Sequence, residues 1–229
     1  VASDDYPALS DSLEKYRLND ASLVYQKDSS TALGQGFRCG FLGLLHLEIV
    51  QERLEREYNQ SIIMTIPSVQ YRFSLKDGRT VEVDNPQYYP DPVMIEKAEE
   101  PFVKASILIP ERYMGAVMNL CLERRGENPQ YAYPTPGRIE VTCSIPLAEV
   151  IYEFYDKLKT VTQGYGSFDY DLSGYRTSDL IKLDILVNGD KIDAFSMMIH
   201  RERARPRALH ICNRLKDEIP RHMFKIAIQ

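Results

Sequence analysis

Four arginines alternate with other residues near the C-terminal end of the chain: Arg201, Arg203, Arg205 and Arg207. A guanidinium group can hold two phosphate oxygens through parallel N–H donors, whereas a lysine acts as a point charge. This stretch could therefore bind the phosphate groups of a polyanion. The alternative, that these side chains are only solvated or pair with the acidic rest of the chain, stays open at this point.

Charge is distributed unevenly around that stretch. Eight Lys or Arg residues and three acidic residues lie between His200 and Lys225, although the whole chain has a formal net charge of −5. Such asymmetry indicates one polyanion-facing end on an acidic body. The candidate RNA-binding residues are Arg201, Arg203, Arg205, Arg207, Arg214, Lys216, Arg221 and Lys225.

Two short motifs invite a nucleotide-binding interpretation. The glycine cluster from Gly34 to Gly40 lacks the spacing of either common phosphate-binding loop, so we interpret it as turn and packing glycine. The Asp171–Gly174 segment has the Asp-x-x-Gly form that GTPases use near the γ-phosphate. Because no phosphate loop precedes it, we treat the match as chance. We expect no catalytic and no GTP-binding residue in this chain.

The histidines and cysteines do not form a recognisable site in the sequence. His46 lacks the second histidine of a zinc-binding helix, and His200 could order a turn or touch a phosphate. The four cysteines are scattered singly, which is typical of thiols in a reducing cytosol. We expect no metal site and no cofactor in these residues. The absence of a long apolar run or leader-like start indicates a protein that is neither membrane-spanning nor secreted.

The first part of the chain is predicted to alternate helices and strands. We expect a helix at 6–18, strands at 21–26 and 31–40, a helix at 41–58, and strands at 61–66 and 68–73. Residues 76–100 contain three prolines and a broken hydrophobic pattern, which predicts a linker.

The second part repeats one pattern twice. A strand at 102–109 ends in Ile-Pro and precedes a helix at 111–125, and a strand at 138–145 ends in Ile-Pro before a helix at 147–158. With short strands at 130–133 and 167–172, the order becomes βαββαβ, which is ferredoxin-like. Beyond 179, two strands flank the hairpin turn Asn188-Gly189, and a basic helix at 208–219 and a strand at 224–228 follow.

The predicted fold class is therefore α+β, with two ferredoxin-like α/β sandwich domains, whose antiparallel sheets carry helices on one face, and a partial third α+β domain. The expected domains are residues 1–75, with a first strand missing, a linker at 76–100, a second domain at 101–178 and a truncated third domain at 179–229.

Several segments together resemble the LepA (elongation factor 4) family of ribosome-binding translational GTPases. The resemblance covers essentially the whole chain. The segments are 17–23, 36–48, 51–57, 101–105, 123–126, 164–170 and 182–189.

The resemblance implies the third domain, the fifth domain and the start of the C-terminal domain of an architecture similar to that of elongation factor G. It also implies a parent protein that hydrolyses GTP with Mg²⁺ and promotes back-translocation or remodelling of tRNAs on stalled ribosomes. The expected partners are ribosomal RNA, ribosomal proteins and tRNA, and the C-terminal arginines would face tRNA. The family is cytoplasmic, in bacteria also peripheral on the inner membrane, and we expect a monomer. This fragment, without the GTPase domain, should be inactive.

Two alternatives remain. An equivalent piece of elongation factor G would share the paired ferredoxin-like domains, but the unit after residue 179 argues against it. A small-molecule-binding ferredoxin-like module would need a pocket with convergent polar groups, and no set of residues in the sequence indicates such a pocket.

Overall fold

The computed structural model describes residues 5–30, 34–64, 69–151, 154–219 and 227–228. The chain divides into two compact units. One contains residues 1–66, 184–196 and 208–229, and the other contains residues 67–183 and 197–207.

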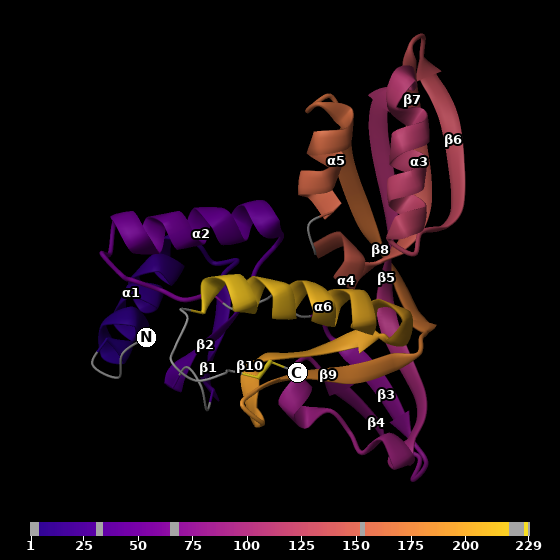
Figure 1. Ribbon diagram of the computed structural model, residues 1–229. Helices are drawn as coiled ribbons and strands as arrows, with labels where there is room; N and C mark the ends of the chain where they lie inside the picture. The colour runs from indigo at the N-terminus through magenta and orange to yellow at the C-terminus, as the bar shows by residue number, and fades with distance from the viewer. Residues whose placement is uncertain (1–4, 31–33, 65–68, 152–153, 220–226, 229) are drawn as a thin grey trace. The chain divides into compact units, whose positions relative to one another are not determined.

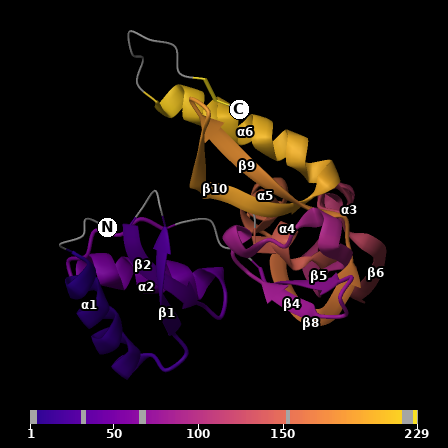
Figure 2. The ribbon, with the colours of Figure 1, turned by 90° about the horizontal axis from the view of Figure 1, so that it is seen from below.

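In the first unit, two helices pack on a hairpin. Helix α1 spans Tyr6–Asn19 and α2 spans Leu44–Arg56, while β1 (Val24–Ser30) pairs antiparallel with β2 (Gly34–Gly40). Figure 2 shows the helices beside the two strands. Leu9, Leu13 and Tyr16 share the buried face of α1, as their spacing predicts. They join Val50 and Leu54 of α2 in one core.

Of the two strands predicted after α2, the structure shows one. Residues 61–64 are not assigned to a strand, and 65–68 lie outside the described residues. The predicted strand at 68–73 corresponds to β3 (Tyr71–Leu75), which pairs with strands of the second unit instead. The apolar alternation correctly indicated a strand, but the pairing partner depends on contacts that are distant in the sequence.

The second unit is built on one long strand. Strand β5 runs from Ile95 to Pro110 and pairs antiparallel with β3, with β7 (Arg138–Pro146) and with β8 (Ser167–Thr177). Strand β6 (Glu127–Thr135) pairs with β7, and β4 (Thr80–Val83) pairs with β3. The part of the sheet ordered β8-β5-β7-β6 has the strand order and connectivity of a ferredoxin-like domain, which confirms the prediction.

Helices cover one face of this sheet (Figure 1). A 3₁₀ turn, η3 (Glu111–Tyr113), leads into α3 (Met114–Glu123), and α4 (Leu147–Ile151) and α5 (Phe154–Thr162) precede β8. The core between helices and sheet contains the fully buried Val117, Ile139 and Leu158. Alternate residues of β5 point into it, as a sheet with one covered face requires.

The prediction of a linker at 76–100 is wrong. This segment contains β4, two 3₁₀ turns, η1 (Pro86–Tyr88) and η2 (Pro92–Met94), and the first part of β5. Pro86 and Pro92 occupy the first positions of these turns, where a missing N–H costs little, and the side chains of Asn85 and Asp91 cap them. Proline spacing therefore marked tight turns within a folded segment.

The C-terminal hairpin is confirmed. Strand β9 (Leu180–Val187) pairs with β10 (Asp190–His200), and Asn188 and Gly189 between them have φ values of 55° and 89°. Positive φ at both positions is the signature of a tight hairpin turn. The base of the hairpin belongs to the second unit, where Leu180 and Met198 join a smaller core around Phe73.

Helix α6 (Arg201–Glu218) follows β10 directly, seven residues earlier than the predicted start at Ala208. Most of the predicted final strand at 224–228 lies outside the described residues, but Ile228 forms an isolated antiparallel bridge with Val187.

Candidate nucleic-acid interface

The four alternating arginines lie on the first turns of α6, so the prediction that they precede the helix is wrong. Pro206 lies inside α6, where it removes one helical N–H and would normally break a helix. The first turns are held by other contacts: Ala204 is buried, and Arg201 and Arg203 are bound to carboxylates. Tertiary contacts therefore offset the proline.

Arg201 binds Asp179, which precedes β9. The two side chains make hydrogen bonds of 2.6 Å and 3.2 Å, and the backbone N–H of Arg201 donates to the carbonyl of Asp179. The hydrogen bond from Arg201 holds the pKa of Asp179 below its ordinary value. Both side chains are more than half exposed, so the pair contributes little to stability.

Arg203 binds a more deeply buried carboxylate. Its Nε and Nη2 donate to the two carboxylate oxygens of Glu149 on α4, at 3.1 Å and 3.2 Å. Arg124, at the end of α3, approaches the same carboxylate at 3.6 Å, and the Glu149 side chain is only 11% exposed. Glu149 therefore lies between two guanidinium groups, and Arg203 connects α6 to the ferredoxin-like domain.

The other candidates divide into three groups. Arg205, Arg214 and Lys216 are exposed, and within the described part of the chain none of them forms an ion pair. Arg207 is half-buried and has an interaction of its own, while Arg221 and Lys225 lie outside the described residues. Arg205 and Lys216 are eleven positions apart, which is about three helical turns, so they share one face of α6 about 16 Å apart. These two cations can contact phosphates along a backbone.

The motifs that we set aside have structural roles. Gly34–Gly40 is β2, with Gly34 at a φ of 75° where the hairpin turns. Asp171–Gly174 lies within β8. Part of this segment pairs with β5, since Asp171 lies opposite Lys104. Neither segment forms a loop at a helix N-terminus, where a phosphate would be bound.

His46 and His200 each stabilise the start of a helix. Nδ1 of His46 accepts the N–H of Leu42 and Nε2 lies 2.9 Å from Asp20, so the ring connects the start of α2 to the end of α1. A hydrogen bond from the Ser22 hydroxyl, and then one from His46, lower the pKa of Asp20 to about 2. Nδ1 of His200 accepts the N–H of Glu202 in the first turn of α6.

The cysteines are free thiols, with Cys121 and Cys143 buried and Cys39 and Cys212 half-buried. Burial raises the pKa of Cys39 to about 11. Across the described ranges no three His, Cys, Asp or Glu side chains are grouped to hold a metal ion. No helix in those ranges is both long and apolar enough to cross a membrane.

A second group of cations was not singled out in the sequence. The guanidinium of Arg112 lies 4.8 Å from the ring centre of Tyr113 and 5.6 Å from that of Tyr165, and Nζ of Lys159 lies 4.2 Å above the Tyr155 ring. The i,i+4 spacing of Tyr155 and Lys159 is visible in the sequence. The approach of Arg112 to Tyr165 depends on how α3 and α5 pack.

Comparison with known families assigns most of the second half of the chain. The family described as elongation factor G C-terminus matches residues 97–186, and the family described as GTP-binding protein LepA C-terminus matches residues 187–229.

Curated relatives match from end to end. Elongation factor 4 of Syntrophobacter fumaroxidans is 73% identical over 229 residues, that of Desulfotalea psychrophila 68%, and that of Leptospira biflexa 50%. Each match covers 100% of this chain but 38% of the relative. A crystal structure of a Thermus thermophilus protein is similar with a TM-score of 0.50 and 17% identity, covering 75% of this chain and 38% of that one. At that identity the likeness concerns the fold alone.

Proposed function

Because the chain belongs to the elongation factor 4 (LepA) family, we propose that it forms a non-catalytic, ribosome-binding part of a translational GTPase. The chain spans 38% of the length of the relatives named above. GTP hydrolysis, with GTP and Mg²⁺ as its requirements, is therefore proposed for the parent protein and assigned to residues outside this chain.

One observation carries the proposal for this part of the protein: Arg205, Arg214 and Lys216 are exposed on α6 and form no ion pair with any residue that the structure describes, in a segment matched by the LepA C-terminus family. The same match favours this family over an equivalent piece of elongation factor G. Cations on an exposed helix bind phosphates of any sequence, because the contact reads charge and not base identity. The expected ligand is the backbone of ribosomal RNA or tRNA.

The finer features of the function are proposals as well. We propose that the parent remodels tRNAs on stalled ribosomes by back-translocation, with α6 contacting tRNA. We also propose that it works in the cytoplasm as a monomer, and that in bacteria a fraction is peripheral on the inner membrane. Fractionation of cells into cytosol and washed membranes measures how much of the parent protein is bound to the inner membrane.

The proposal is tested by sedimentation of the 229-residue chain with ribosomes at about 50 and about 200 mM salt. The test variant carries Arg205→Ala, Arg214→Ala and Lys216→Ala together. The matched control is Arg201→Ala, because Arg201 is on the same helix but is bound to Asp179. We expect the parent chain and the control to sediment with ribosomes at low salt, and the triple variant to bind more weakly.

Loss of phosphate contacts also lowers the salt dependence of binding. If all three cations contact phosphates, the slope of log affinity against log salt becomes shallower by about 2 to 3. A triple variant with the affinity and slope of the parent would contradict the role of α6. A parent chain that stays in the supernatant at both salt concentrations would contradict ribosome binding itself.

A further inference from the structure

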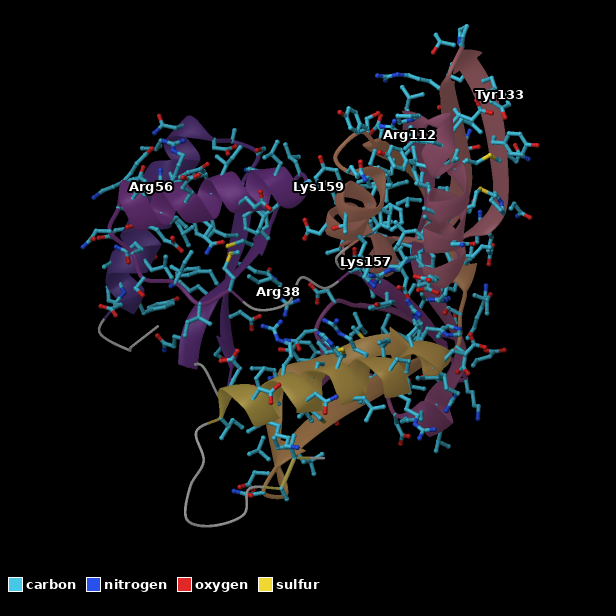
Figure 3. All side chains as sticks on the ribbon, turned by 45° about the horizontal axis from the view of Figure 1, so that its top comes forward. Arg38, Arg56, Arg112, Tyr133, Lys157 and Lys159 are labelled. Carbon is cyan, nitrogen blue, oxygen red and sulfur yellow. The ribbon has the colours of Figure 1, made fainter. Side chains whose placement is uncertain are left out.

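Two buried thiols lie together inside the ferredoxin-like domain. Cys121 belongs to α3 and Cys143 to β7, and both are part of the core between the helices and the sheet. Figure 3 marks the two sides of this region, with Arg112 just before α3 and Tyr133 on β6. The proposed function uses neither thiol.

Local structure directs the two cysteines towards each other. Cys121 shares the buried face of α3 with Val117, and that face packs on the sheet. Cys143 lies two positions after the fully buried Val141, so both side chains leave β7 on the side that the helices cover. Cys121 and Cys143 therefore meet where α3 rests on the sheet.

The two sulfur atoms are in direct contact. The thiol of Cys121 donates a hydrogen bond to the sulfur of Cys143, and this bond lowers the pKa of Cys143. The same bond, together with burial, raises the pKa of Cys121. Because the thiolate is the reactive form of cysteine, Cys143 is the better nucleophile of the pair.

The last turn of α3 controls access to the pair. Cys121 lies two positions before Glu123, where the helix ends, and the neighbouring Leu122 is 57% exposed. Helix ends open at a lower free energy than the centre of a core. A small reagent can therefore reach the thiols after a local opening, without unfolding of the whole chain.

The remaining cysteines differ from this pair. Cys39 and Cys212 are half-buried and belong to the other compact unit. They can react with a small disulfide, but neither is hydrogen-bonded to Cys121 or Cys143 in the way that those two thiols are bonded to each other. They serve as internal references for oxidation at single thiols.

We infer that Cys121 and Cys143 form an oxidative modification site, at which a low-molecular-weight disulfide such as oxidised glutathione converts the two thiols into an intrachain disulfide bond. This site is independent of the proposed function, so either can fail without the other. The alternative is that both cysteines serve only as small apolar side chains of the core.

The reaction consists of two thiol–disulfide exchanges. The thiolate of Cys143 attacks one sulfur of oxidised glutathione, the S–S bond of glutathione breaks, and one glutathione thiolate leaves. Cys121 loses its proton to that thiolate and attacks the Cys143 sulfur of the mixed disulfide, which releases the second glutathione thiolate. The protein loses two electrons and two protons, and one oxidised glutathione becomes two reduced glutathione molecules.

The test incubates the folded 229-residue chain with oxidised glutathione for roughly hours, the timescale of uncatalysed exchange. Remaining thiols are then blocked in denaturant, and the digested chain is mapped by mass spectrometry. We expect one pair of peptides joined through Cys121 and Cys143, whereas Cys39 and Cys212 stay free or carry glutathione. The rate should increase in urea well below the unfolding midpoint, because urea promotes local opening.

Thermal unfolding reports whether the folded domain accommodates the bond. We expect the oxidised chain to melt roughly 5 to 15 °C higher than the reduced chain, because a closed loop restricts the unfolded state, and dithiothreitol should reverse the shift. Cys121→Ala and Cys143→Ala should each abolish the shift. The matched control is Cys212→Ala, which removes a thiol outside the pair and should keep it.

The peptide map of the parent chain is decisive even if a core variant folds poorly. Free thiols at Cys121 and Cys143 after incubation would overturn the inference, and so would a bond that forms only at urea concentrations that unfold the chain. Disulfides between either member of the pair and Cys39 or Cys212 would contradict the pairing. A linked chain that melts below the reduced chain would show that the folded core does not fit the bond.

Discussion

At the scale of residues, the arginines of α6 differ because different carboxylates lie within their reach. Arg203 forms two hydrogen bonds with the nearly buried Glu149, whereas Arg205, two positions later, faces away and stays exposed. Successive positions on a helix are rotated by about 100°, so alternation in the sequence distributes the charges around the axis. The run of arginines therefore has two roles. Arg203 attaches the start of α6 to Glu149, and Arg205 contributes to a candidate RNA-binding surface.

Removal of Glu149 should cost more stability than removal of Arg203. Glu149→Ala deprives both Arg203 and Arg124 of a carboxylate, and Arg124 is almost fully buried, so we expect a loss of about 2 to 4 kcal/mol. Arg203→Ala leaves Glu149 with Arg124, and the Arg203 side chain is one-third exposed, so we expect about 1 to 2 kcal/mol.

Urea unfolding of the two variants measures the difference. A larger loss for Arg203→Ala than for Glu149→Ala would contradict this account of the cluster. Arg203→Ala should also keep the ribosome affinity of the parent, because its guanidinium group is already bound.

At the scale of elements, the ends of helices depend on single residues. After α3 the chain passes through Arg125, at a φ of 58°, and then Gly126, whose N–H donates to the carbonyl of Cys121. A Cβ at Gly126 would lie 2.6 Å from that carbonyl oxygen. The close approach of two backbone segments therefore requires glycine here, and it directs the chain from α3 into β6.

Two glycine substitutions should have opposite effects. Gly126→Ala forces the backbone apart and should destabilise the chain by roughly 2 kcal/mol or more. Gly115→Ala is the matched control, because it lies within α3 with open space around the new methyl group, and alanine favours helix by about 0.5 to 1 kcal/mol. Thermal unfolding measures both, and a Gly126→Ala variant as stable as the parent would contradict the proposed role of the turn.

At the scale of the whole molecule, the sheet formed by β1 and β2 has only two strands among the described residues. A two-stranded hairpin is marginally stable unless a further strand or a packed helix supports it. The domain that the family resemblance implies has a further strand before α1, and we propose that this strand pairs with β2 in the parent protein.

Extension of the chain at its N-terminus with the preceding residues of the parent protein tests that proposal. We expect slower amide hydrogen exchange along β2 and a higher melting temperature for the first unit, because each paired N–H is then protected from water. An extension of equal length with a scrambled sequence is the control. Exchange along β2 that is the same in all three chains would contradict the proposed pairing.

The sequence by itself determined the local features. The apolar periodicity of α1, the strand–helix–strand repeat around β5 and β7, and the Asn188-Gly189 turn were all predictable, because each depends on residues close together in the chain. The family was predictable too, from motifs that extend over the whole chain.

Only the tertiary structure decided which elements join which sheet and which charged groups remain free. Strand β3 belongs to the second unit, and α6 tolerates Pro206, because contacts with residues distant in the sequence outweigh local preference. Likewise, Arg203 is bound because folding brings Glu149 to it from 54 positions away. Spacing along the chain specifies periodicity, but burial and ion pairing depend on three-dimensional distance, which the local pattern does not encode.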